Sequence, residues 1–214
     1  YKIFLYSTGW VGSLILSEGP WDASMKWTIG EFEYSLMYSS VLYALLDDSF
    51  IRDVYRGQIN FVFNDISNVA KIKGPTFTYA HILSPHPPFV FGEGNENKGI
   101  SKVFTFTEED AILNGKDGSQ YQESYKESYK SQLTVIDNKI LKTLDKILSD
   151  SPKPPVIILM SDHGPAASFT YDNLSAEGAK ERYSVLRAVY FPDRDYSQLF
   201  KTQSHINVFR VIIN

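Results

Sequence analysis

The residues 156–165, VIILMSDHGP, decide how we interpret the fold of this chain. Five apolar residues are followed, after Ser161, by Asp162, His163 and Gly164. A short apolar run without alternation is typical of a strand in a parallel sheet that is covered on both faces. Ligand sites of such sheets lie just beyond the carboxyl ends of the strands. We therefore expect Asp162 and His163 to emerge from a buried strand at the edge where ligands bind.

A long helix precedes this strand. Apolar residues recur there every three or four positions, which predicts a helix with one stripe facing a core. The stripe consists of Tyr125, Tyr129, Leu133, Ile136, Ile140, Leu144 and Ile147. The helix is expected to end at residues 149–152, SDSP, directly before the strand.

The remaining elements are expected to alternate between strands and helices. The predicted strands are residues 1–6, 76–83 and 183–191, and the predicted helices are residues 28–48 and 206–213. Residues 59–63, INFVF, fit either a short strand or part of a helix–turn element. Residues 91–120 are expected to form a long exposed loop, with a short helix at 107–113, and the segment after Pro165 is expected to be polar as far as Arg182. The alternation predicts a single α/β domain over 1–214, with a mostly parallel central sheet between two layers of helices.

Composition excludes some classes of function. The chain has 214 residues, a net charge of -4 and a pI near 5.6, which argues against nucleic-acid binding without excluding a local basic pocket. It has no cysteine, so neither a disulfide nor a thiolate metal site can form. No apolar run approaches 18 residues, so we expect this chain to be soluble. Because apolar runs lie at both ends, we also expect it to be part of a longer protein.

Asp162 and His163 are candidate metal ligands. A carboxylate and an imidazole on a turn tightened by Gly164 suit a divalent cation such as Zn²⁺ or Mn²⁺. The alternative is that Asp162 caps the following segment and His163 only hydrogen-bonds a loop.

His81 and His86 form a second cluster, in residues 81–89, HILSPHPPF. These histidines could bind a metal or donate hydrogen bonds to an anionic oxygen of a substrate. The surrounding prolines restrict the backbone and lower the entropy lost on ordering a site. The alternative is an ordinary rigid loop in which the histidines are incidental.

Two further residues are candidates for accessory roles. His205 opens the last predicted helix, where a cap or a packing residue is the alternative interpretation. Arg182 could assist an anion, and surface ion pairing is the alternative. Taken together, a metal and imidazoles at one sheet edge suit the chemistry of phosphoryl or sulfuryl esters, which needs charge neutralisation and donors for the non-bridging oxygens.

Three segments in this order resemble the sulfatase-like branch of the alkaline phosphatase superfamily: 81–91, HILSPHPPFVF; 135–148, VIDNKILKTLDKIL; and 154–165, PPVIILMSDHGP. That branch includes sulfatases, phosphoethanolamine transferases and lipoteichoic acid synthases. The resemblance covers residues 76–191 and implies an alkaline-phosphatase-like three-layer fold. It implies that Asp162 and His163 bind a divalent metal (Zn²⁺, Mn²⁺ or Ca²⁺). It also implies that His81 and His86 contact the substrate oxygens.

The chain departs from the family pattern in its first part. Neither the acidic metal ligand of the first strand nor a nucleophile at a helix start is identifiable, and we assign neither Ser7 nor Thr8 as nucleophile. A formylglycine nucleophile is excluded within this chain, since it has no cysteine. We expect these parts to lie in sequence before Tyr1. Two ligands alone hold an ion poorly, so we expect weak or no metal binding and negligible esterase activity for the chain itself.

The expected function is therefore part of a metal-dependent hydrolase or transferase acting on phosphate or sulfate esters. Substrates implied by the resemblance include lipid headgroups and cell-surface polymers. It also implies a parent protein at the extracytoplasmic face of a membrane, anchored by segments outside this chain. One alternative is a non-catalytic module on the same fold that binds anionic groups or glycans at His81 and His86. The other is a structural α/β domain with coincidental histidines.

Overall fold

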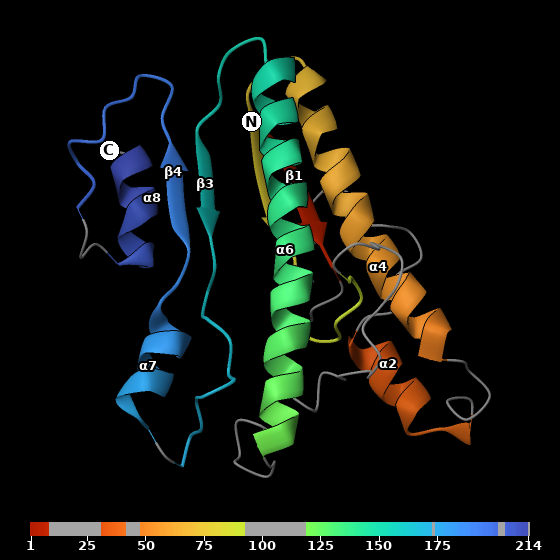
Figure 1. Ribbon diagram of the computed structural model, residues 1–214. Coiled ribbons are helices and arrows are strands. Elements are labelled where there is room, and N and C mark those ends of the chain that lie inside the picture. Colours follow the sequence, from red (N-terminus) through yellow and green to blue (C-terminus); the bar gives the residue numbers. More distant parts are fainter. Residues whose placement is uncertain (9–30, 42–47, 93–118, 173, 201–203, 214) are drawn as a thin grey trace.

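The computed structural model describes residues 1–8, 31–41, 48–92, 119–172, 174–200 and 204–213 (Figure 1). In the described residues the strands are β1 (Lys2–Ser7), β2 (Thr76–His81), β3 (Ile157–Met160) and β4 (Arg187–Tyr190). The helices are α2 (Glu31–Tyr38), α4 (Asp48–Asp65), the 3-10 helix η1 (Ile66–Lys71), α6 (Ser119–Asp150), α7 (Ala176–Tyr183) and α8 (His205–Ile213). The chain is thus a mixed α/β protein. None of the helices in these ranges is long and apolar enough to cross a membrane.

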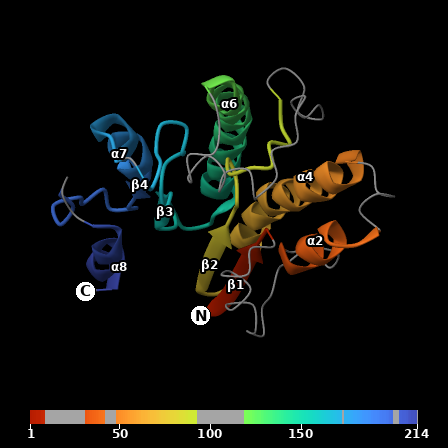
Figure 2. The same cartoon turned by 90° about the horizontal axis from the view of Figure 1, so that it is seen from below.

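The strands form two pairs. β1 and β2 are parallel, with Tyr6 opposite Ala80, whereas β3 and β4 are antiparallel, with Ile158 opposite Val189. Figures 1 and 2 show β2 and β3 as neighbours, with α4 and α6 on one side of the strands. No hydrogen-bonded ladder joins the two pairs within the described ranges. The parallel pair agrees with the predicted sheet, and the antiparallel β4 differs from it.

β3 is less buried than the apolar run predicts. All four of its residues are half-buried, and Val156, just before it, is exposed. An unbroken apolar run indicates a strand but does not specify its partner or how completely it is covered.

The strand predicted at 183–191 is shorter in the structure, where Tyr183 still belongs to α7 and β4 begins at Arg187. The segment predicted as polar therefore contains a helix, capped by Ser175, whose Oγ accepts a hydrogen bond from Gly178 N at 2.9 Å.

Two other predictions concern α2 and α4. Residues 59–63, left open between strand and helix, lie within α4, where Ile59, Val62 and Phe63 are buried at helical spacing. The helix predicted over 28–48 is interrupted, since α2 ends at Tyr38. The hydroxyls of Ser39 and Ser40 donate hydrogen bonds to the carbonyls three residues earlier, a local pattern that competes with helix continuation. The rest of that prediction falls partly outside the described residues.

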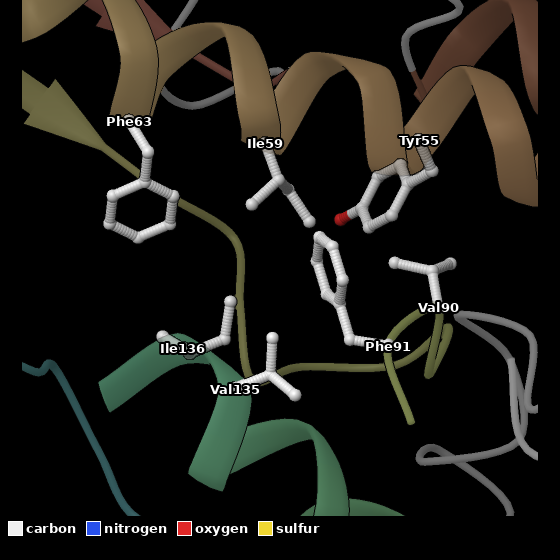
Figure 3. Close-up of a cluster of buried hydrophobic side chains, with 7 residues drawn as sticks. All are labelled: Tyr55, Ile59, Phe63, Val90, Phe91, Val135 and Ile136. Atoms are coloured by element: carbon white, nitrogen blue, oxygen red, sulfur yellow. The ribbon is translucent and has the colours of Figure 1, made fainter. Parts of the chain in front are cut away.

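The main core lies between α4 and α6, which is the amphipathic helix predicted from its apolar stripe. Figure 3 shows the cluster, and its residues are Tyr55, Ile59, Phe63, Val90, Phe91, Val135 and Ile136. Phe91 is fully buried, so the predicted exposed loop is wrong at its start, and at its end Ser119 and Gln120 belong to α6. The remainder, with the helix predicted at 107–113, lies outside the described residues. The core anchors the segment after β2 between two helices.

Candidate functional site

The turn after β3 carries Asp162 and His163, as predicted. Ser161 holds its start, because Ser161 N donates to Leu186 O at 3.1 Å and Leu186 N donates to Ser161 Oγ at 2.9 Å. Beyond it the Asp162 side chain is 78% exposed and that of His163 is 37% exposed. The two side chains therefore stand at the surface, on a turn that is hydrogen-bonded to the residue before β4.

The turn brings Asp162 and His163 to one point. Asp162 Oδ1 accepts from the His163 backbone N–H at 2.9 Å, and Asp162 Oδ2 lies 3.5 Å from His163 Nε2. Two ligands of one tetrahedral ion, each at about 2.0–2.1 Å, are separated by about 3.4 Å. The two atoms are thus spaced as neighbouring ligands of a metal ion would be. The Oδ1 contact stays within the turn and leaves Oδ2 for other partners.

Arg182 lies against the same turn. Its Nη1 donates to Gly164 O at 2.9 Å, and its Nη2 lies 3.3 Å from His163 Nε2. Its guanidinium carbon is 6.0 Å from the centre of the Phe169 ring, within the range of a cation–π contact. The accessory residue proposed from the sequence therefore contacts a predicted metal ligand directly.

The loop after Gly164 is clamped to α7 by backbone and side-chain contacts. Gly164 N donates to Arg182 O at 2.7 Å. The Glu181 carboxylate accepts from Ala167 N at 2.7 Å and from Ser168 N at 2.9 Å. A Cβ at Gly164 would overlap Glu181 O. The close approach of two backbones, which only glycine allows, positions Arg182 beside His163.

His81, at the end of β2, lies within electrostatic reach of this turn. Its pKa is lowered by burial, and the Asp162 charge opposes that shift. Its Nδ1 is buried and makes no hydrogen bond in the described part of the chain. The structure thus brings His81 toward Asp162, as expected for the ends of adjacent strands, and leaves a neutral imidazole with an unused nitrogen.

The lowered pKa of His81 predicts a pH dependence of stability. In the window below its ordinary value of 6.5 the unfolded chain binds more protons than the folded chain. The free energy of unfolding therefore decreases as the pH falls through that window, with a limiting slope of about 1.4 kcal/mol per pH unit for one proton. Between pH 7.5 and 5.5, the free energy of unfolding measured in urea should decrease less for His81→Asn than for the unsubstituted chain. Equal losses would contradict the prediction, since the other histidines are common to both.

His86 lies in a loop fixed from α6 and α4, and one contact of its ring is with that loop. Its Nδ1 is 2.6 Å from Pro87 O. Gln132, fully buried on α6, donates from Nε2 to Pro85 O and His86 O at 3.2 and 3.3 Å. Its Oε1 accepts from Val90 N and Phe91 N at 2.7 and 3.2 Å. One side chain thus holds both ends of the loop.

The sequence contains a signal for Gln132 that does not depend on any motif. Residue 132 falls between Tyr129 and Ile136 on the predicted apolar stripe of α6, at three-to-four spacing. A polar side chain on the buried stripe of a helix needs hydrogen-bond partners. Here the partners are backbone groups of the histidine loop, so Gln132 is a positioning residue for His86.

Further contacts complete the support of the loop. Arg56 Nε donates to Val90 O at 2.9 Å, and Tyr55 Oη donates to Leu83 O at 3.2 Å. Thr8 is buried, and its Oγ1 accepts from Leu83 N at 2.8 Å and lies 3.4 Å from His81 O. These contacts give Thr8 a structural role at the start of the loop.

One expected site residue, His205, cannot be compared with this group. His205 is the first residue of α8, and its side chain lies outside the described part of the structure. Within the described ranges, no three His, Asp, Glu or Cys side chains are grouped so that they could hold a metal ion. The assembled candidate site therefore consists of Asp162, His163 and Arg182, with His81 near Asp162.

Comparison with known proteins adds no relative. No family model matches the chain, and no match is found among curated proteins or solved structures.

Proposed function

We propose that this chain carries part of a divalent-metal site that acts on phosphate or sulfate esters, as in the sulfatase-like enzymes that its motifs resemble. The observation that supports this most is the 3.5 Å separation of Asp162 Oδ2 and His163 Nε2 at the end of β3. Zn²⁺, Mn²⁺ and Ca²⁺ are the candidate ions. The three-layer alkaline-phosphatase-like sandwich belongs to the same proposal, supported by the parallel pair β1–β2 and the cover of α4 and α6.

The proposed roles follow from the chemistry of each side chain. Asp162 and His163 would hold the ion, which when bound supplies positive charge to a reacting ester. The neutral His81 and the cationic Arg182 are donors suited to the non-bridging oxygens of a tetrahedral anion. His86, held through its backbone by Gln132, would contribute to the same anion. The nucleophile and the other ligands are not identified in this sequence.

The proposal extends to the substrate and the setting of the parent protein. The resemblance suggests a phosphate or sulfate ester on a lipid headgroup or a cell-surface polymer, processed at the extracytoplasmic face of a membrane. It involves no nucleic acid, in keeping with the net charge of -4. Any membrane attachment would be made by segments outside this chain.

Paramagnetic broadening by Mn²⁺ tests the metal site even when binding is weak. In the ¹⁵N-labelled chain, substoichiometric Mn²⁺ should broaden the amide signals of residues 161–165 before others. Asp162→Asn removes one of two ligands and should weaken the effect by about tenfold or more. The matched control is Asp137→Asn, an exposed carboxylate on α6, which should leave the broadening unchanged.

Two results would contradict parts of this proposal. Broadening centred away from residues 161–165, or insensitive to Asp162→Asn, would exclude the metal site. Tight stoichiometric binding of Zn²⁺ or Mn²⁺ in calorimetry would contradict the expectation that two ligands hold an ion weakly. We expect negligible metal-dependent hydrolysis of p-nitrophenyl phosphate or sulfate by this chain.

A second candidate is the non-catalytic anion-binding module. The observation that favours it is the position of the Arg182 guanidinium beside His163. A guanidinium can bind an anion without a metal ion. Titration with sulfate or phosphate in the presence of a chelator distinguishes the two functions. Shifts of the His81 and Arg182 side-chain signals under these conditions would favour the binding module, and shifts that need Mn²⁺ would favour the metal site.

A further inference from the structure

We propose that Arg182 occupies the metal-coordinating position of His163 in the metal-free protein, so that an ion binds there only when the guanidinium moves away. The inference rests on the proposed metal site. It concerns which of two cations, the arginine or a divalent ion, holds the same nitrogen.

The hydrogen bonds of the imidazole determine which nitrogen can bind an ion. His163 Nδ1 lies 3.0 Å from the carbonyl oxygen of Gly164, which can only accept, so Nδ1 carries the proton. Nε2 then has a lone pair, and Arg182 Nη2 donates to it at 3.3 Å. An ion would need that lone pair at about 2.0–2.1 Å. Because Nε2 has one lone pair, the two contacts exclude each other.

Asp162 adds to the competition. Its Oδ2 lies 3.5 Å from the same Nε2, so the carboxylate and the guanidinium face the same nitrogen. A guanidinium and a divalent ion at this point would repel each other at short range. The arginine therefore takes the place of an ion in partly neutralising the site, and its departure is part of metal binding.

The rest of Arg182 keeps the guanidinium close after it leaves Nε2. Its Nη1 donates to Gly164 O at 2.9 Å, and its own carbonyl accepts from Gly164 N at 2.7 Å. The guanidinium carbon also lies 6.0 Å from the centre of the Phe169 ring. A small rotation about the outer bonds of the side chain frees Nε2 and retains the backbone clamp. The released donor then lies beside the ion, where a tetrahedral anion would need it.

Metal affinity of variants at Arg182 tests this directly. Arg182→Met keeps an unbranched side chain and removes the competing donor, so affinity for Mn²⁺, measured by relaxation enhancement at pH 7.5, should rise by about tenfold. Arg182→Lys retains a cation, so its affinity for Mn²⁺ should rise less than that of Arg182→Met. Arg187→Met, at an arginine that donates to Phe200 O at 3.3 Å, is the control and should match the unsubstituted chain.

The imidazole ¹⁵N spectrum of the metal-free chain provides a readout that a purely structural role would not move. In the unsubstituted chain His163 should carry its proton on Nδ1, with Nε2 hydrogen-bonded. In Arg182→Met the Nε2 resonance should shift as its donor is lost, while the other histidines stay unchanged. Such a shift together with the gain in affinity supports the proposal.

The possible failures are distinguishable. Metal binding that is equal or weaker in Arg182→Met, while Asp162→Asn still weakens it, would overturn the competition and leave the proposed metal site intact. Absence of Mn²⁺ binding near Asp162 in every variant would overturn both. A His163 Nε2 resonance that is insensitive to Arg182→Met would also overturn the proposal, because the guanidinium would then not occupy that nitrogen.

Discussion

Gly164→Ala is expected to lower the free energy of unfolding by about 3 kcal/mol, because the new Cβ would overlap the carbonyl oxygen of Glu181. The neighbouring atom is backbone, so no side chain can rotate away. Relief requires α7 to separate from the turn, which breaks the hydrogen bond from Gly164 N to Arg182 O. Arg182 would move away from His163 at the same time, so the candidate site should be lost with the clamp.

Urea unfolding followed by far-ultraviolet circular dichroism measures this loss, and hydrogen exchange shows where it occurs. Faster exchange should be concentrated in residues 164–169 and in α7. Gly74→Ala is the matched control, since a Cβ there meets nothing within 4 Å and only its φ of +97° disfavours alanine. That substitution should cost about 1 kcal/mol. Equal effects of the two substitutions would contradict the steric explanation.

Gln132→Met is expected to destabilise the chain by a similar amount while changing side-chain volume little. The substitution leaves the N–H groups of Val90 and Phe91 without their acceptor in a fully buried place. An unsatisfied buried N–H costs about 1–3 kcal/mol, so the total should be about 3 kcal/mol. The carbonyls of Pro85 and His86 lose their donors as well, which should loosen the loop that carries His86.

Chemical denaturation measures the stability change, and the His86 ring signals in proton spectra report the loop. The control is Gln198→Met, at an exposed glutamine, which should stay within about 0.5 kcal/mol of the unsubstituted chain. A loss below about 1 kcal/mol for Gln132→Met would mean that water replaces the amide. Gln132 would then have no positioning role.

Features that depend on local periodicity were predictable from the sequence. The apolar stripe predicted α6, and β-branched and aromatic residues before Pro85 predicted β2. The apolar run at 156–160 predicted a strand that delivers Asp162 and His163 into a turn, and β3 agrees with this. Each of these signals lies within a few neighbouring residues, and side-chain burial on one face imposes it directly.

Features that depend on partners far apart in the chain were not predictable. The apolar run at 156–160 predicted a strand of a parallel sheet, whereas β3 pairs with an antiparallel strand, because an apolar run does not specify the direction of its partner. It placed Arg182 among accessory candidates with surface ion pairing as the alternative, and the contact with His163 arises from the packing of α7 on the turn. Residues 59–63 stayed ambiguous because a short run with four apolar residues fits a strand or a helix equally well.

The sequence by itself determined which candidate groups follow the apolar strand, namely a carboxylate and an imidazole. Local burial and turn chemistry suffice to specify them. Their use depends on tertiary structure. The distance between Asp162 Oδ2 and His163 Nε2 and the presence of Arg182 at that nitrogen result from α7 docking against Gly164. Close backbone contact between distant segments determines these distances, and no local pattern encodes them.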